Sequence, residues 1–170
     1  MTKSVLTGLA AALALFLAGS ATAGHRGITA CATRDLVVWL DTNGDAAAGS
    51  VYYELELTNL SRQSCVLRGY PGVSGVDLAG RPLGAPAIRN AGNTVGPVVL
   101  SPGASASALL KIADTGVFPS ATCRTTTAAG LRVYPPNETA SAVVPYPFRA
   151  CSGPGATYLQ VRAVTSATRP

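Results

Sequence analysis

Short stretches of alternating apolar and polar residues recur along this chain, and turn-forming residues separate them. The clearest stretch is residues 51–58, whose odd-numbered members are valine, tyrosine and two leucines, while the even-numbered members are tyrosine, glutamate and threonine. Successive side chains of a strand point to opposite faces, so this pattern predicts a strand with one apolar and one wet face. Helical periodicity is nearly absent. The chain is therefore expected to fold as an all-β protein.

Further strand candidates follow at short intervals, separated by Pro-Gly, Ala-Gly and Gly-Pro-Gly turns. They are residues 35–41, 65–68, 73–78, 95–100, 104–113, 130–134, 140–144 and 157–164. The apolar run in residues 35–41 is continuous, which indicates either a strand buried on both faces or a position in the core of a sandwich. The alanines of residues 104–113 also permit a helix, but their alternation with serine and lysine favours a strand. About nine short strands predict an immunoglobulin-like antiparallel β-sandwich.

The first 23 residues have the form of a secretory signal peptide. Lys3 gives a basic start, residues 6–18 are almost entirely apolar, and Ala21-Thr22-Ala23 fits a small-residue cleavage site. This apolar run is too short to span a bilayer, so we expect no membrane span. No cysteine directly follows the region, so no lipid anchor is expected. The sequence predicts a secreted protein, free or loosely associated with the cell wall.

Cleavage after Ala23 leaves a chain that suits a single domain. Residues 31–164 carry the strand candidates and are expected to form one sandwich. Residues 24–30 are predicted to be a flexible N-terminal segment, and residues 165–170 a disordered tail.

The four cysteines become candidates for disulfide bonds once export is predicted, because extracellular space is oxidising. Four cysteines allow three pairings, and sequence alone does not choose among them. Their spacing favours Cys31 with Cys65 and Cys123 with Cys151, since each bridge would then cross-link one half of the sandwich. No C-x-x-C spacing occurs and the chain has one histidine, so neither a zinc site nor any other cofactor is expected.

The net charge is +5, and it is carried almost entirely by arginines that stand singly along the chain. A protein that binds nucleic acid usually concentrates its basic residues in a patch. The scattered charge of an exported chain therefore argues against nucleic-acid binding. It leaves anionic wall polymers as possible partners.

Three segments carry a resemblance to a known family. They are Cys65-Val66-Leu67-Arg68-Gly69-Tyr70-Pro71-Gly72-Val73, Gly49-Ser50-Val51-Tyr52-Tyr53, and Ala129-Gly130-Leu131-Arg132-Val133-Tyr134-Pro135-Pro136. With them the chain resembles a family of exported actinobacterial proteins catalogued as domain of unknown function 4232. The resemblance spans roughly residues 31–164 and includes all four cysteines. It implies a secreted or lipid-anchored immunoglobulin-like sandwich and implies no catalytic residues.

Residues that could support catalysis or bind metal are few. His25 lies just after the predicted cleavage site, where nothing would hold an imidazole in place, and no G-x-S-x-G sequence occurs. Glu54 and Glu56 would share the wet face of one strand, without an evident cleft. Residues 41–45 bring three side chains with oxygen atoms close together in the sequence, but they lack the residue spacing of a calcium-binding EF-hand loop. Their Asn43-Gly44 pair instead predicts a hairpin turn.

Aromatic residues next to prolines offer the best candidate binding surface. In residues 145–149 the prolines exclude a central strand, so this segment is expected to be an edge strand or loop that presents Tyr146, Phe148 and Arg149. The alternative is an apolar plug that closes one end of the sandwich. Residues 41–49 and 89–95 are the other candidate binding segments, because function in such folds tends to lie in loops.

These observations favour a non-enzymatic binding or structural module that acts on a wall polymer or an extracellular protein. A secreted protease inhibitor is the alternative, with residues 120–124 beside Cys123 as its reactive loop. A hydrolytic enzyme is the third possibility, and it is disfavoured because no nucleophile motif is present. The sequence does not identify the ligand.

Overall fold

The computed structural model describes residues 27–167, which form thirteen strands, two 3-10 helices and one short α-helix. The strands are β1 (Thr29–Ala30), β2 (Leu36–Ala47), β3 (Ser50–Asn59), β4 (Cys65–Arg68), β5 (Gly72–Val76), β6 (Pro82–Leu83), β7 (Ile88–Asn90), β8 (Pro97–Leu100), β9 (Ser105–Ala113), β10 (Thr125–Tyr134), β11 (Ala142–Cys151), β12 (Leu159–Arg162) and β13 (Thr165–Ser166). The helices are η1 (Thr33–Asp35), η2 (Thr115–Val117) and α1 (Ser120–Cys123). The predicted all-β class is confirmed.

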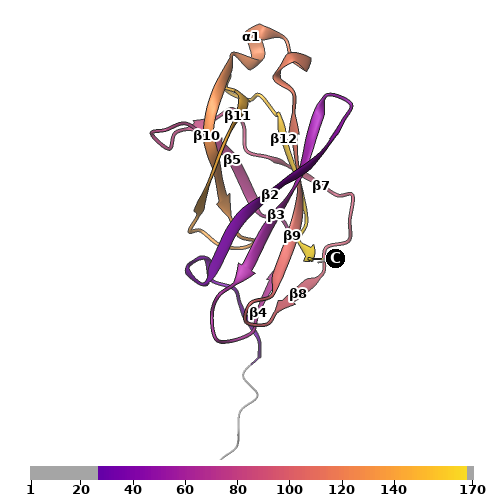
Figure 1. The fold of residues 1–170 in the computed structure, drawn as a ribbon, viewed down its shortest axis with the longest axis vertical. Coiled ribbons are helices and arrows are strands. Elements are labelled where there is room, and N and C mark those ends of the chain that lie inside the picture. Colours follow the sequence, from indigo (N-terminus) through magenta and orange to yellow (C-terminus); the bar gives the residue numbers. More distant parts are fainter. Residues whose placement is uncertain (1–26, 168–170) are drawn as a thin grey trace, which may run out of the picture.

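The strands form three sheets (Figure 1). The largest has the order β2-β3-β9-β12-β7, with β13 also paired to β9, and the second has the order β11-β10-β5-β6. A small third sheet has the order β1-β4-β8. Pairing is antiparallel except between β1 and β4 and between β7 and β12. The two larger sheets pack face to face as a β-sandwich, an arrangement compatible with an immunoglobulin-like fold.

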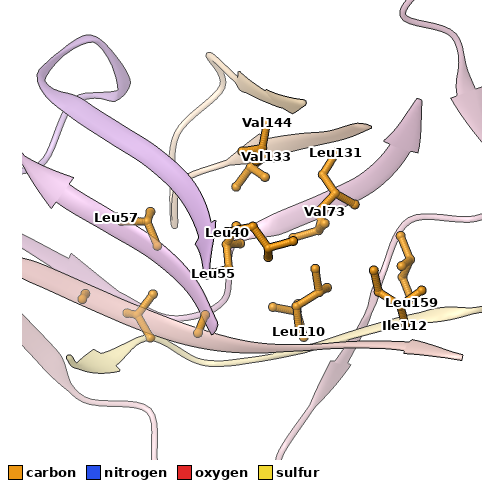
Figure 2. Close-up of a cluster of buried hydrophobic side chains, with 14 of the residues drawn as sticks. Leu40, Leu55, Leu57, Val73, Leu110, Ile112, Leu131, Val133, Val144 and Leu159 are labelled. Atoms are coloured by element: carbon orange, nitrogen blue, oxygen red, sulfur yellow. The ribbon is translucent and has the colours of Figure 1, made fainter. Parts of the chain in front are cut away.

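The core lies between these two sheets. Figure 2 shows apolar side chains from both sheets pointing toward one another: Leu40, Leu55, Leu57, Leu110, Ile112 and Leu159 from the largest sheet, and Val73, Leu131, Val133 and Val144 from the second. Leu55 and Leu57 are fully buried, as the alternation in residues 51–58 predicted. Residues 105–113 form β9, so the prediction of a strand at residues 104–113 is confirmed.

Of the two alternatives for residues 35–41, a strand buried on both faces is wrong, whereas a position in the sandwich core is correct for Leu36 and Leu40. Leu36 and Leu40 are buried, but Val37 and Trp39 between them are 43% and 41% exposed. Strand β2 lies at the edge of the largest sheet, and no described residue covers the outer face of that sheet at Val37 and Trp39, so both side chains are in contact with solvent. The run is continuous in composition, yet only alternate members reach the core.

Both disulfide bonds form as the spacing favoured, between Cys31 and Cys65 and between Cys123 and Cys151. The first ties the chain after β1 to the start of β4, and the second ties the end of α1 to the end of β11. Two disulfides are typical of a protein that folds in an oxidising compartment. Among residues 27–167, no helix is long and apolar enough to cross a membrane.

Short strands at both ends extend the paired chain two residues beyond the predicted range 31–164. Residues 29–30 pair with β4, although the sequence suggested a flexible segment there, and residues 165–166 pair with β9 instead of belonging to a tail. In each case the partner strand lies far away in the sequence. The predicted signal peptide, His25 and residues 168–170 lie outside the described residues.

The hairpin turn between β2 and β3 is at Ala48-Gly49, so its prediction at Asn43-Gly44 is wrong. Ala48 and Gly49 have φ angles of 46° and 71°, as the central residues of a two-residue hairpin turn of type I′ require. Asn43-Gly44 lies instead in a bulge of β2, between the pairs Asp41–Glu54 and Asp45–Tyr52. Gly44 is tightly placed there, because a Cβ atom would come within 2.5 Å of the Tyr53 ring.

Candidate functional site

An open cleft of about 470 Å³ lies at one end of the sandwich, between the β2–β3 hairpin and strand β11. The hairpin contributes residues 46–51 and Tyr53, β11 contributes Tyr146, Phe148 and Arg149, and the end of β9 closes the floor with Ile112 and Ala113. We refer to this site as the aromatic cleft. Its walls come from both large sheets, so only the packed sandwich brings them together.

Four aromatic rings form a row that starts in the aromatic cleft and ends in the core. The rings of Tyr53 and Tyr146 meet edge to face at 5.3 Å, and Tyr146 stacks with Phe148 at 6.1 Å. Phe148 continues to Tyr158 at 6.3 Å. Aromatic pairs at such distances stabilise a structure by roughly 0.5–1.5 kcal/mol each beyond their burial. The row therefore holds the cleft walls in fixed positions.

Strand β11 explains how these side chains reach the cleft. It pairs only with β10, so it is an edge strand, the first of the two alternatives (edge strand or loop) that the prolines allowed. Pro145 and Pro147 are exposed, while the alternate residues Tyr146 and Phe148 are half-buried and pack against the core. Tyr146 and Phe148 therefore combine the two alternatives that the sequence left open. They help close one end of the sandwich, and they also line an accessible surface.

The hydroxyl groups of the cleft are linked to each other. Tyr146 donates a hydrogen bond of 2.6 Å to the Tyr53 hydroxyl. Burial, reinforced by this bond, raises the pKa of Tyr146 from 10.0 to about 12. Tyr53 uses its oxygen as the acceptor and keeps its own hydroxyl proton, which is one donor for a bound molecule. At neutral pH Tyr146 is thus uncharged.

The stability of the protein should fall as the pH rises from 10 toward 12. Burial raises the pKa of Tyr146 and of Tyr158 to about 12, so both stay neutral in the folded protein while the unfolded chain ionises near 10. Their contribution is complete below pH 10 and is lost as the pH approaches 12. Tyrosinate absorbance should show Tyr146 and Tyr158 ionising only as the pH approaches 12. In Tyr146→Phe only one late step should remain, and two late steps in that variant would contradict the assignment.

Two charged residues stand at the rim of the aromatic cleft. Arg149 is exposed and forms no ion pair within residues 27–167. Asp114 is exposed and accepts a hydrogen bond of 2.7 Å from the Gly116 N–H, which caps η2. The cleft is therefore apolar inside and carries one charge of each sign at its mouth.

The remaining sequence candidates lie elsewhere or contribute in part. Residues 46–49 of the segment 41–49 line the cleft, whereas Arg89 of the segment 89–95 lies over the Tyr70 ring at 5.8 Å, away from it.

Glu54 and Glu56 lie on the outer face of β3. Residues 120–124, the candidate reactive loop of an inhibitor, are exposed except for Cys123 and form α1 and its left-handed cap. The described residues contain no cluster of histidine, cysteine, aspartate or glutamate able to hold a metal.

Sequence reasoning placed Tyr53 on an apolar strand face but did not identify it as a site residue. The alanine-rich end of the hairpin was included only as part of the candidate loop segment 41–49. The signal for Tyr53 was its bulk and hydroxyl group within an otherwise aliphatic face, between Val51 and Leu55. Alanines carry no such signal, because only their position opposite β11 makes them part of a wall.

The fold and the site together define a class: a disulfide-bonded β-sandwich domain with an aromatic cleft between its two sheets. The family whose model matches is described as Domain of unknown function (DUF4232), and the match covers residues 31–165. The chain belongs to this family, as the resemblance indicated. No curated protein and no solved structure matches the chain.

Proposed function

We propose that this protein is a secreted, non-enzymatic binding module, and that the aromatic cleft takes up an apolar segment of a cell-wall component or of a surface protein. The observation that carries the proposal is the convergence of Tyr53, Tyr146 and Phe148 from two sheets around an accessible cavity of about 470 Å³. Ligand sites are typically concave and mostly apolar, with a few placed polar groups, and this cleft has that character.

The chemistry of the cleft supports binding more than catalysis. Tyr146 keeps its proton up to a pKa of about 12, so it is poorly suited to take or give a proton near neutral pH. The Tyr53 hydroxyl supplies one hydrogen-bond donor to orient a ligand. The rings supply flat apolar area that is already held in place, which reduces the entropy lost on binding.

An extracellular location rests on the two disulfide bonds and on the signal-like first 23 residues. The net charge of +5 would favour approach to an anionic wall. Charge alone gives weak and salt-sensitive attraction, whereas apolar contact in the cleft is expected to persist at physiological salt.

Co-sedimentation of the purified, oxidised protein with isolated cell walls tests the proposal at low and physiological salt. The variant Ala47→Trp places a bulky ring in the cleft without removing any core contact, because Ala47 is exposed and lines the cavity. Ala79→Trp is the matched control, at an exposed alanine away from the cleft. We expect retention at both salts, lowered at least about tenfold by Ala47→Trp and unchanged by Ala79→Trp.

Two outcomes would refute a wall-binding role of the cleft. Retention only at low salt would show that the protein binds walls through its overall positive charge alone. Equal retention of Ala47→Trp and the parent protein would show that the binding site lies outside the cleft. If walls retain nothing at either salt, the partner is a protein. A pull-down of extracellular proteins must then recover a species that Ala47→Trp loses and Ala79→Trp keeps.

A further inference from the structure

A second pocket lies on the outer face of the largest sheet, turned away from the core and from the aromatic cleft. It measures about 110 Å³, and Tyr52, Asn90, Leu109, Lys111, Gln160 and Arg162 line it. We refer to it as the outer pocket. Its floor is four neighbouring strands, β3, β9, β12 and β7, whose register places Lys111 opposite both Tyr52 and Gln160, and Arg162 opposite Asn90. The alternate residues Leu110 and Val161 point into the core.

The side-chain amide oxygens of Asn90 and Gln160 in the outer pocket each accept a hydrogen bond. Asn90 accepts a hydrogen bond of 2.9 Å from the Gly92 N–H through Oδ1, which orients its amide group. Its Nδ2 then donates to Oε1 of Gln160 at 3.3 Å. An amide has one acceptor oxygen and two N–H donors. The amide N–H groups left without a partner are one of Asn90 and both of Gln160.

Two positive charges share this pocket with the spare donors. The ion pairs among residues 27–167 are Arg34–Asp35 and Arg81–Asp77, so neither Lys111 nor Arg162 has a carboxylate partner there. The Lys111 ammonium lies 6.0 Å from the centre of the Tyr52 ring, a contact that favours its charge but supplies no hydrogen-bond acceptor. Glu54, the acid that stands opposite Leu109 on this face, makes no ion pair with either cation.

From this arrangement we infer that the outer pocket binds an oxyanion, a phosphate or a carboxylate group, between Lys111, Arg162 and the amide N–H groups of Asn90 and Gln160. Two cations and several unpaired N–H donors are complementary to a group that carries negative charge and only acceptor atoms. Hydrogen bonds between charged partners are about twice as strong as neutral ones. The inference is independent of the aromatic cleft, which lies between the sheets.

Titration of the oxidised protein with inorganic phosphate, and separately with glucuronate, tests the inference in ¹H–¹⁵N NMR spectra at constant ionic strength. The side-chain signals of Asn90, Gln160 and Arg162 Nε should shift and saturate with at least one of the two anions. Saturation by phosphate identifies a phosphoryl ligand, and saturation by glucuronate identifies a carboxylate. No saturation by either anion, or equal non-saturating shifts at the distant Arg62, would overturn the proposal.

Matched variants separate this site from general charge effects. Lys111→Gln and Arg162→Gln should each weaken anion binding about tenfold or more, while Arg62→Gln, which makes the same change in net charge at an exposed residue, should leave it unchanged. Gln160→Glu adds an internal carboxylate beside both cations. It should abolish anion binding and raise the melting temperature. Loss of binding with a raised melting temperature excludes misfolding as the cause, whereas undiminished binding in Gln160→Glu would refute the site.

Discussion

Replacing both cysteines of the Cys31–Cys65 bridge with alanine is expected to lower the free energy of unfolding by about 3.8 kcal/mol. The bridge closes a loop of 34 residues, and the chain-entropy relation gives this value because the cross-link restricts the unfolded chain. The bridge between Cys123 and Cys151 closes 28 residues and should contribute about 3.6 kcal/mol by the same relation.

Urea unfolding of the two double variants and the parent protein measures these effects. Removal of a cross-link lets the unfolded chain expand, so the dependence of the unfolding free energy on urea should steepen as the midpoint falls. Reduction of the parent protein should reproduce the combined loss, which is a large part of the 5–15 kcal/mol typical of a domain. A loss below about 1 kcal/mol in either double variant would show that the unfolded chain is already restricted there.

Leu110→Ala is expected to lower the free energy of unfolding by about 3–5 kcal/mol. Leu110 is fully buried on β9 and points between the two sheets toward Val73 and Leu131 of the opposite sheet (Figure 2). Truncation removes apolar contacts from both sheets and leaves a cavity that a β-sandwich, held by its backbone pairing, closes only in part.

Leu78→Ala is the matched control, because Leu78 is 98% exposed and the chemical change is the same. It should change the free energy of unfolding by less than about 0.5 kcal/mol. In urea unfolding, Leu110→Ala should shift the midpoint with little change of slope, unlike the disulfide variants. Similar effects of the two leucine variants would contradict the position of the core between the sheets.

The candidate site was predictable only in part. Prolines at alternate positions of residues 145–149 identified an edge strand or loop with Tyr146 and Phe148 on it, and the structure places both rings in the cleft wall. The opposite wall was not predictable, because Tyr53 and Tyr146 are 93 residues apart and meet only when the sheets pack. The outer pocket was missed for the same reason, since sheet register alone brings Lys111, Gln160 and Arg162 together.

The misplaced hairpin turn shows how tertiary packing overrides a local preference. Asn-Gly is a strong turn signal, yet the pairs Leu40–Leu55 and Val38–Leu57 set the register of β2 against β3. That register carries the hairpin past Asn43-Gly44 to Ala48-Gly49, and the surplus residues form a bulge over Tyr53. The lengthened hairpin then supplies one wall of the aromatic cleft.

By itself, the sequence determined the all-β class, most of the strands and the favoured cysteine pairing. These depend on the alternation of neighbouring side chains and on cysteine spacing, both of which are local properties of a chain. The tertiary structure alone decided which strands are edges, why Val37 and Trp39 are exposed, and which residues meet in the cleft and in the outer pocket. Those features depend on contacts between segments far apart in sequence, and the packing of buried faces fixes such contacts only when the whole sandwich forms.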